Sequence, residues 1–329
     1  MDNTPDDVFF TVVMPTRNRP ELFKIALDSV MDQQFKRFEI VVVNDGSTGD
    51  DLAQYQAMES QYAGKATFHY LLHRPNGHGQ SYSMNYGALN AQGQYLCFLD
   101  DDDNWTDPEH LERAYQSITH SPNPVDLYFT NQTAYFSDNR KQTDNVWIED
   151  LAAQLHQQTT DQQGAWAVTT EVMLQSKGFA HLNCSIYRKG LYEQIQGMDE
   201  NIRYECDRDV YLSALDAADT ILHHPAYIAR HNIPDKKKKD NMSTLVSEYE
   251  KNIFQLRVYD KGILLSKKTA VMKHCKTGKG YVVKRIADYA YQSGNKRLAL
   301  YYAKEGLAIA FGVKWLSFTL YLFFASLMP

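Results

Sequence analysis

The sequence has few cysteines, no excess of positive charge and no apolar leader. Its 329 residues include four cysteines, with no Cys-x-x-Cys pair and no zinc-type spacing, so we expect reduced thiols, as in the cytoplasm. The net charge of -6 disfavours nucleic acid as the main partner. The acidic N-terminus lacks a basic segment with an apolar stretch behind it, so we expect no secretory signal.

Two common nucleotide-binding motifs are also absent. No Gly-x-Gly-x-x-Gly follows the first expected strand, which disfavours a dinucleotide fold of the usual kind. The phosphate loop Gly-x-x-x-x-Gly-Lys-Ser/Thr does not occur either. Apolar residues nevertheless make up 43% of the chain and charged residues 22%, which is ordinary for a globular protein with an ample core.

Strand and helix patterns alternate along the first 130 residues. Continuous apolar, β-branched runs predict strands that are covered on both faces. Prolines are favoured in the first turn of a helix, and two of them open helical patterns here. Because short connections join alternating elements, we expect an α/β fold with a mostly parallel sheet flanked by helices. The expected strands are 8–14, 38–43, 66–72, 95–99 and 125–130, and the expected helices begin at Pro20 and Pro108 or cover 51–62 and 82–91.

The rest of the chain divides into a polar stretch, a second ordered stretch and a helical end. Residues 131–175 are rich in Gln, Thr and Asn, and we expect irregular connections there with one short helix. We therefore expect one domain over residues 1–240, in halves 1–130 and 131–240, and a helical region over 241–329. Further expected elements are an ordered segment at 181–187, helices at 189–196 and 209–218, a strand at 226–230, and a helical hairpin over 290–308 that is broken near 293–295.

Four consecutive aspartates, Asp100 to Asp103, end the apolar run 95–99. Such a block repels itself unless a cation binds, and Mg²⁺ is usually held by one or two carboxylates together with substrate phosphates. Asp45 follows another strand of the same sheet, so both acidic strand ends face one crevice. The alternatives are a solvated acidic turn or helix cap for the run, and a turn for Asp45. The spacing excludes an EF-hand calcium loop.

Together these segments resemble glycosyltransferase family 2, whose nucleotide-sugar-binding fold is called GT-A. The resemblance covers roughly residues 8–235. It implies an inverting, nucleotide-sugar-dependent transferase of the bacterial cell-surface polysaccharide type, with a nucleotide-binding half over 1–130 and an acceptor half over 131–240. The matching stretches are VVMPTRNR at 12–19, VNDGS at 43–47, NYGALNAQG at 85–93 and FLDDDDNW at 98–105.

The resemblance implies a nucleoside site at the ends of the first two strands. Pro15 and Arg17 match the loop that contacts the nucleoside, and Asp45 matches the carboxylate that reads the base, commonly uracil. A UDP-sugar is therefore the expected donor. The chain departs from many relatives at Met84, where they carry a basic residue. If that residue holds the diphosphate, its role must pass to Arg17, Arg74 or the later lysines.

The resemblance also implies a metal site. Asp100, Asp101 and Asp102 match the family's DxD motif, with Asp101 near the ribose and Asp102 as a ligand of Mg²⁺ or Mn²⁺ bridging the diphosphate. His231, at the end of a strand, would be a further metal ligand, and the alternative is a purely structural histidine. The lysines at 236–239 would close over the diphosphate, face anionic headgroups or form a solvated loop.

Asp207 is the expected general base. It follows the turn 197–200, which is similar to the family's Gly-Phe-Asp-Glu, and Cys206 stands where relatives have Glu. An inverting transferase needs one carboxylate opposite the leaving group to deprotonate the acceptor hydroxyl. The alternative is that Asp207 caps the helix expected at 209–218.

The last segment, WLSFTLYLFFASL at 315–327, is apolar nearly all round. It is shorter than the ~20 residues that span a bilayer. We expect residues 306–329 to contact a membrane peripherally, which places the protein in the cytoplasm at the inner face of the cytoplasmic membrane. The alternatives are a buried core helix or a dimer helix.

These residues predict a metal-dependent inverting glycosyltransferase that moves a sugar from a nucleotide-sugar to a hydroxyl of a glycan or lipid-linked acceptor in cell-envelope polysaccharide synthesis. Two other functions stay open at this point. A nucleotidyltransferase would also combine an α/β sheet, a nucleotide and carboxylate-bound Mg²⁺. A catalytically silent, membrane-associated protein would bind nucleotide or glycan without turnover.

Overall fold

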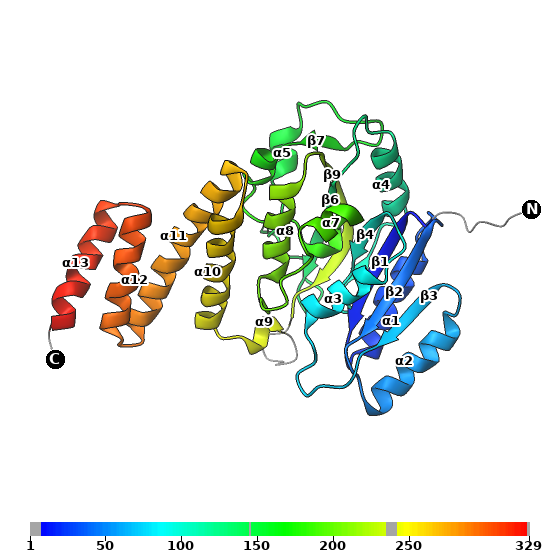
Figure 1. Cartoon of the computed structure of the whole chain (residues 1–329), viewed down its shortest axis with the longest axis horizontal. Coiled ribbons are helices and arrows are strands. Elements are labelled where there is room, and N and C mark those ends of the chain that lie inside the picture. The colour runs from blue at the N-terminus through cyan, green and yellow to red at the C-terminus, as the bar shows by residue number, and fades with distance from the viewer. Residues whose placement is uncertain (1–7, 145, 235–241, 328–329) are drawn as a thin grey trace, which may run out of the picture.

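The computed structural model describes residues 8–144, 146–234 and 242–327. An α/β body is built around one central sheet, and a row of long helices extends from one side of it, ending in α13 (Figure 1). Among the described residues, the sheet has nine strands, in the order β3-β2-β1-β4-β8-β6-β9-β5, with β7 paired to β9. The predicted α/β class with flanking helices and a helical C-terminal region is confirmed.

The first half of the sheet is parallel, as its alternating pattern predicts. Strands β3, β2, β1 and β4 pair in parallel, and every residue of β1 is buried because helices cover both faces. The predicted positions hold to within about two residues. The elements are β1 (Phe10–Thr16), α1 (Pro20–Met31), β2 (Phe38–Asn44), α2 (Gly49–Gln61), β3 (Ala66–Tyr70), α3 (Gln80–Leu89) and β4 (Tyr95–Phe98).

The second half of the sheet is mixed. Strand β8 enters antiparallel between β4 and β6, whereas β6 and β9 pair in parallel. The polar segment that leads into β8 has no periodicity that would reveal its direction, so the sequence suggested more parallel pairing than the fold contains. The elements are β5 (Asn104–Trp105), α4 (His110–Thr119), β6 (Leu127–Tyr135), α5 (Leu151–Leu155), β7 (Trp166–Val168), α6 (Thr170–Met173), η1 (Leu182–Cys184), β8 (Ser185–Arg188), α7 (Lys189–Gln194), α8 (Cys206–Ala217) and β9 (Ile221–Asn232).

Residues 131–175 are more ordered than expected. Strand β6 continues to Tyr135, and the segment also holds α5, β7 and α6. The continuation of β6 is polar in sequence but buried: Thr130, Asn131 and Gln132 all lie in the interior. Buried polar residues break the apolar pattern by which a strand is recognised, and the same holds for β9, which begins five residues earlier than predicted, before His223 and His224.

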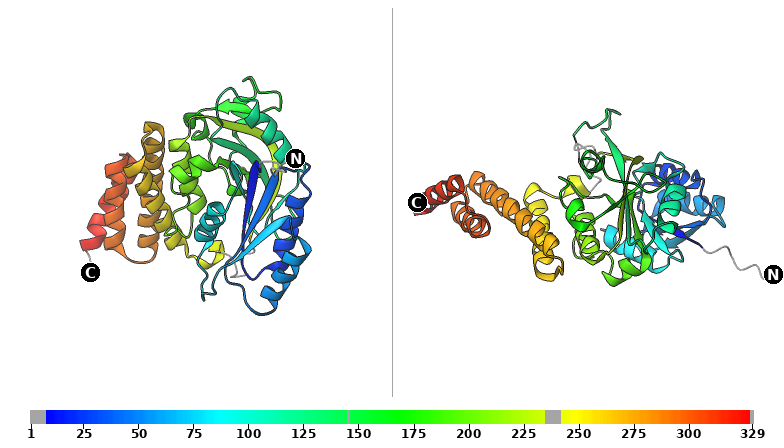
Figure 2. Two further views of the ribbon diagram at one scale, coloured as in Figure 1. Left: turned by 45° about the vertical axis from the view of Figure 1, so that its right-hand side comes forward. Right: turned by 90° about the horizontal axis from the view of Figure 1, so that it is seen from above.

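The C-terminal region consists of stacked helices. The hairpin break is confirmed: Gly294 has φ 80 after α11, and Asn295 then caps α12 by accepting from Leu298 N at 3.1 Å. Helix α10 packs on α8 and, with part of α11, contributes Val258 and Val282 to the main core. Helices α12 and α13 lie farther out, as Figure 2 shows from above. The elements are α9 (Met242–Leu245), α10 (Glu248–Leu265), α11 (Thr269–Gln292), α12 (Lys296–Ile309) and α13 (Val313–Leu327).

Helix α13 is too short to cross a membrane. It has 15 residues, which at 1.5 Å per residue amounts to about 22 Å, less than the ~30 Å hydrocarbon core. No helix in the described ranges is long and apolar enough to span a bilayer.

Candidate active site

Three strand ends meet at one edge of the sheet. Strands β1 and β2 are in register, with Thr16 opposite Asn44, and Asp45 N donates to Thr16 O at 2.9 Å. Strand β4 lies on the other side of β1, and Thr16 Oγ1 donates to Asp101 Oδ2 at 2.8 Å. The predicted convergence of Asp45 and the acidic run at one edge is therefore what the fold produces.

Arg19 is a member of this site that sequence reasoning missed. Its Nη1 lies 2.9 Å from Asp102 Oδ2 and 3.4 Å from Asp101 Oδ1. It directly precedes α1, whose Pro20 we used only as a helix signal. One guanidinium thus offsets part of the charge of two carboxylates.

Despite Arg19, the aspartates of the acidic run still repel one another, and their burial and this repulsion raise the pKa of two of them. Burial, followed by repulsion from the neighbouring aspartates, raises the pKa of Asp102 to about 6 and holds the pKa of Asp100 well above its ordinary value. Carboxylate oxygens with unbalanced charge at a sheet edge fit a hard divalent cation such as Mg²⁺ or Mn²⁺.

Asp103 is fully engaged by hydrogen bonds. Its Oδ2 accepts from His231 Nδ1 at 2.7 Å and from Asn183 Nδ2 at 2.6 Å, and its Oδ1 accepts from Asn232 N at 2.7 Å. Burial alone would raise the pKa of Asp103, but His231 lowers it. With Nδ1 held in this way, Nε2 is the nitrogen through which His231 would bind a metal, an arrangement common around metal-bound histidines.

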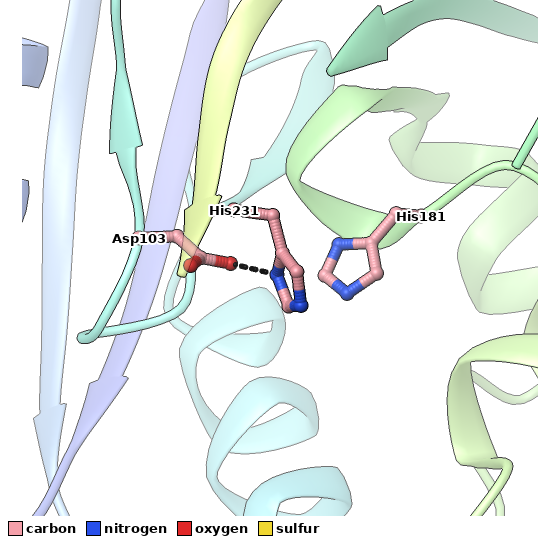
Figure 3. Close-up of side chains that lie close together, drawn as sticks. All are labelled: Asp103, His181 and His231. Carbon is pink, nitrogen blue, oxygen red and sulfur yellow. Dashed lines mark hydrogen bonds and ion pairs between the residues drawn. The ribbon is translucent and has the colours of Figure 1, made fainter. Parts of the chain in front are cut away.

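His181 completes a group of three side chains. Ligand atoms of Asp103, His181 and His231 lie within 4.8 Å of one another, and Figure 3 shows the ring of His231 between the other two side chains. Nδ1 of His181 accepts from Asn183 N at 3.3 Å, and burial lowers the pKa of His181 to about 3, so its ring is neutral. Of this group the sequence singled out His231 as a metal ligand, whereas the only signals for the other two were the fourth aspartate of the run and the start of the ordered segment at 181.

The predicted metal ligands do not pair with each other. His231 hydrogen bonds to Asp103, whereas Asp102 pairs with Arg19 and its main-chain oxygen accepts from Asn232 Nδ2 at 2.7 Å. Both residues nevertheless belong to one cluster, since Asn232 bonds to Asp102 and Asp103 and directly follows His231.

A loop of the chain covers the predicted nucleoside residues. Asp45 accepts from His78 N at 2.8 Å, from His78 Nδ1 at 2.7 Å and from Gly79 N at 3.0 Å. Arg17 Nη2 donates to the main-chain oxygen of Arg74 at 2.7 Å. Gly77 fits between these two side chains only because it lacks Cβ, which would lie 2.2 Å from Arg17 and 2.4 Å from Asp45.

Pro15 lies within β1 rather than in the loop after it. It is buried and pairs with Val43 of β2, so among the predicted nucleoside residues it is the one in the sheet itself. Arg17 is the first residue beyond the strand and is partly exposed.

Asp207 lies in the first turn of α8, which two side-chain contacts connect to the acidic run. Gln80 Nε2 donates to Asp100 Oδ1 at 2.7 Å, and Cys206 Sγ lies 3.9 Å from Gln80 Oε1. The start of α8 is thereby linked to the end of β4. Burial raises the pKa of Asp207, which suits a carboxylate that must accept a proton.

The alternative role of Asp207 as a helix cap is wrong. Helix α8 begins at Cys206, the capping position belongs to Glu205, and Asp207 lies inside the first turn. Glu205 has φ 65, a left-handed conformation that costs free energy in a residue other than glycine, and its carboxylate pairs with Arg208.

Met84 and its neighbour on α3 have structural roles. Met84 is fully buried in the core, so its side chain provides packing and no charge for a diphosphate. Asn85 Nδ2 donates to Met198 O at 2.9 Å, and Asn85 Oδ1 accepts from Met198 N and Tyr192 Oη, both at 2.9 Å. The lysines at 236–239, proposed to approach the diphosphate, lie outside the described residues.

Replacing Asn85 by alanine tests this structural role. It would leave the buried hydroxyl of Tyr192 and two main-chain groups of Met198 without partners, which costs roughly 2 kcal/mol. We expect a lower melting temperature with unchanged nucleotide affinity in the folded protein. The control is Asn90→Ala at the exposed end of the same helix, where a single bond to Tyr86 O is lost. Equal melting temperatures for the two variants would contradict the assignment.

Known structures have the same fold. TarS 1-349 of S. aureus, in complex with UDP-GlcNAc, aligns with a TM-score of 0.65 at 18% identity, over 92% of this chain and 81% of that chain. The mannosyltransferase PcManGT of Pyrobaculum calidifontis, in complex with GDP-Man and Mn²⁺, aligns with a TM-score of 0.56 at 16% identity, over 97% and 86%. At such identities the likeness concerns the fold, which is GT-A.

The family is identified by the sequence itself. The model of glycosyl transferase family 2 matches residues 11–195, more than half of the chain, and the chain therefore belongs to that family. The succinoglycan biosynthesis protein ExoW of Rhizobium meliloti (strain 1021) is 29% identical over 199 residues, which are 56% of this chain and 57% of that protein. The chain thus covers less than two thirds of the first curated relatives that it matches.

Proposed function

We propose that the protein is a metal-dependent, inverting glycosyltransferase that moves a sugar from a UDP-sugar to a hydroxyl of a glycan or lipid-linked acceptor in bacterial polysaccharide synthesis. The observation that carries this proposal is the link from the acidic run through Gln80 to Cys206, the residue that precedes Asp207 in the first turn of α8. Family membership and the similarity to a succinoglycan biosynthesis protein support it.

The donor would bind at the ends of β1 and β2. Asp45 and Arg17 would recognise the nucleoside there, and their bonds to the 74–79 loop place that loop against the same ligand. The neighbouring structures contain UDP-GlcNAc in TarS and GDP-Man in PcManGT, so the fold accommodates more than one nucleotide. We choose UDP because an aspartate at the position of Asp45 commonly reads uracil in the family that the sequence resembles.

The cation would be held by Asp102 and His231, with Asp101 directed to the ribose by its bonds to Thr16 and Arg19. Mg²⁺ or Mn²⁺ bound there would neutralise the charge that develops on the leaving nucleoside diphosphate. Asp103 would orient His231, and Arg19 would stabilise the carboxylates before the donor binds.

Asp207 would take the proton of the acceptor hydroxyl. Its position in the first turn of α8 fixes the carboxylate, and its raised pKa improves it as a base relative to an exposed aspartate. The attacking oxygen would approach the anomeric carbon from the side opposite the diphosphate, which inverts the configuration there.

A lipid-linked acceptor would be met at a membrane. We propose that residues 306–329 bring the protein to the inner face of the cytoplasmic membrane as a peripheral contact, since the exposed side chains of α13 are largely apolar.

Calorimetric titration of UDP, GDP, CDP, dTDP and ADP, each with Mn²⁺ and with EDTA, tests the donor site. We expect UDP to bind tightly with Mn²⁺ and much more weakly with EDTA. Failure of every nucleotide to bind would overturn the transferase proposal. Metal-dependent binding without turnover of any UDP-sugar would favour the silent binding protein, and release of pyrophosphate from a nucleoside triphosphate would favour the nucleotidyltransferase.

A further inference from the structure

Positive charge is concentrated in the last helices of an otherwise acidic chain. Residues 269–329 contain nine lysines and arginines but only two acidic residues, Asp288 and Glu305, whereas the whole chain has a net charge of -6. A charge asymmetry of this kind between two parts of a chain indicates an anionic partner for the basic part.

Three of these lysines line a cleft of about 360 Å³. Lys273, Lys276 and Lys284 project from α11 toward Ile309 and Ala310, where α12 ends. Lys284 also lies over the ring of Trp315, with Nζ 5.4 Å from the ring centroid, so the cleft reaches the start of α13.

Large exposed apolar side chains follow the cleft residue Ala310 in the chain and continue along α13. Phe311, which directly follows Ala310, and Val313, at the start of α13, are 73% and 72% exposed. On α13, Thr319, Leu322 and Ala325 are buried. The opposite face carries Leu320, Tyr321, Phe324 and Leu327, which are exposed and recur at helical spacing.

We propose that this lysine cleft and the exposed face of α13 form a docking surface for a bilayer that contains anionic phospholipids. Headgroup phosphates would bind Lys273, Lys276 and Lys284, while Phe311, Val313 and the exposed face of α13 enter the interfacial region. The helix is too short to span, so it lies in the plane of the membrane. Membrane binding itself does not depend on the proposed function; only its benefit does, because a lipid-linked acceptor would be reached at the membrane.

Charge complementarity favours the membrane over a second copy of the chain. In a two-fold dimer through this face, the lysine clefts of the two copies would lie in one shared interface and repel each other. A bilayer matches both the lysine cleft and the apolar face of α13, because its headgroup phosphates lie directly above an apolar layer.

Vesicle flotation of the full chain tests the proposal. We expect binding to vesicles of phosphatidylcholine with phosphatidylglycerol, weak binding to phosphatidylcholine alone, and loss of binding at high salt. The triple variant Lys273→Gln, Lys276→Gln and Lys284→Gln should bind about 100-fold more weakly, from roughly fivefold for each lysine near an anionic surface. The matched control replaces three exposed lysines of the α/β body by glutamine: Lys36, Lys65 and Lys177.

A second variant, Phe311→Ser with Phe324→Ser, removes two exposed rings, so we expect it to fold and to bind the vesicles more weakly. Equal binding by the two triple variants, or failure of the unaltered protein to bind anionic vesicles, would overturn the proposal. A dimer in sedimentation that Phe324→Ser dissociates would assign the face to a second copy instead. UDP affinity, measured on the same samples, reports the donor site separately, so failure of the transferase proposal is distinguishable from failure of this one.

Discussion

Asp207→Asn should greatly slow sugar transfer and leave nucleotide binding intact. A positioned general base contributes about 10²–10⁴-fold to such reactions, and the amide cannot accept the hydroxyl proton. We expect kcat to fall by that factor while the calorimetric affinity for the nucleotide with Mn²⁺ stays within about twofold, since Asp207 belongs to α8 whereas Arg17 and Asp45 follow β1 and β2. The measurement is the release of nucleoside diphosphate from the donor that the nucleotide panel identifies.

The matched control lies two residues further along the same helix. Asp209 is buried, and Lys261 Nζ donates to its Oδ2 at 2.6 Å, away from the acidic run. Asp209→Asn should lower the melting temperature, but at temperatures where this variant is folded its turnover should be unchanged. If both variants lost activity equally, or if Asp207→Asn kept more than about a tenth of the rate, Asp207 would not be the base.

The pH dependence of turnover gives an independent check on Asp207. Burial raises its pKa, so the group is protonated and inactive at pH values where an exposed aspartate, with pKa ≈ 3.9, would still be ionised. The rate at saturating donor and metal should therefore fall, as the pH decreases, through a pKa above that ordinary value. A rate that stays constant down to the ordinary pKa of aspartate would contradict the assignment.

Asp102→Asn and His231→Ala should each remove the stabilisation that metal and nucleotide give to the folded protein. A ligand at about 100 times its dissociation constant stabilises the native state by roughly 2.7 kcal/mol. We expect the unaltered protein to show a large rise in melting temperature with UDP and Mn²⁺ together, and these two variants to show almost none. Turnover should fall by about 10²–10³-fold, as is typical when a group that stabilises developing charge is removed.

Asp103→Asn tests whether Asp103 orients His231 or is itself a metal ligand. Asp103 would act through His231, and substitution of such a partner typically weakens metal affinity by 10–100-fold without abolishing it. We expect saturation at higher Mn²⁺ to restore most of the thermal shift in Asp103→Asn but not in Asp102→Asn. Asp50→Asn, at the exposed start of α2, is the neutral control. Restoration of both variants by Mn²⁺, or of neither, would show that the two aspartates do not have these separate roles.

Much of the fold and part of the site followed from local sequence. The apolar runs of β1 and β2 predict buried strands because such runs can bury both faces, and the break at 293–295 combines a glycine with a capping asparagine. The position of Asp45 beside the acidic run also followed, since parallel strands bring their carboxyl ends to one edge.

The tertiary structure alone decided which side chains meet. Arg19 pairs with Asp102 across 83 positions, and His231 meets Asp103 across 128. The first contact depends on the pairing of β1 with β4 and the second on the pairing of β5 with β9, which no periodicity within a strand encodes. By itself the sequence determined the parallel strands of the first half, the acidic edge and the helical C-terminal region, because burial and helix capping act within a few residues. The tertiary structure determined the grouping of Asp103 with His181 and His231 and the gathering of lysines beside Ile309 and Ala310, because these depend on how distant elements pack.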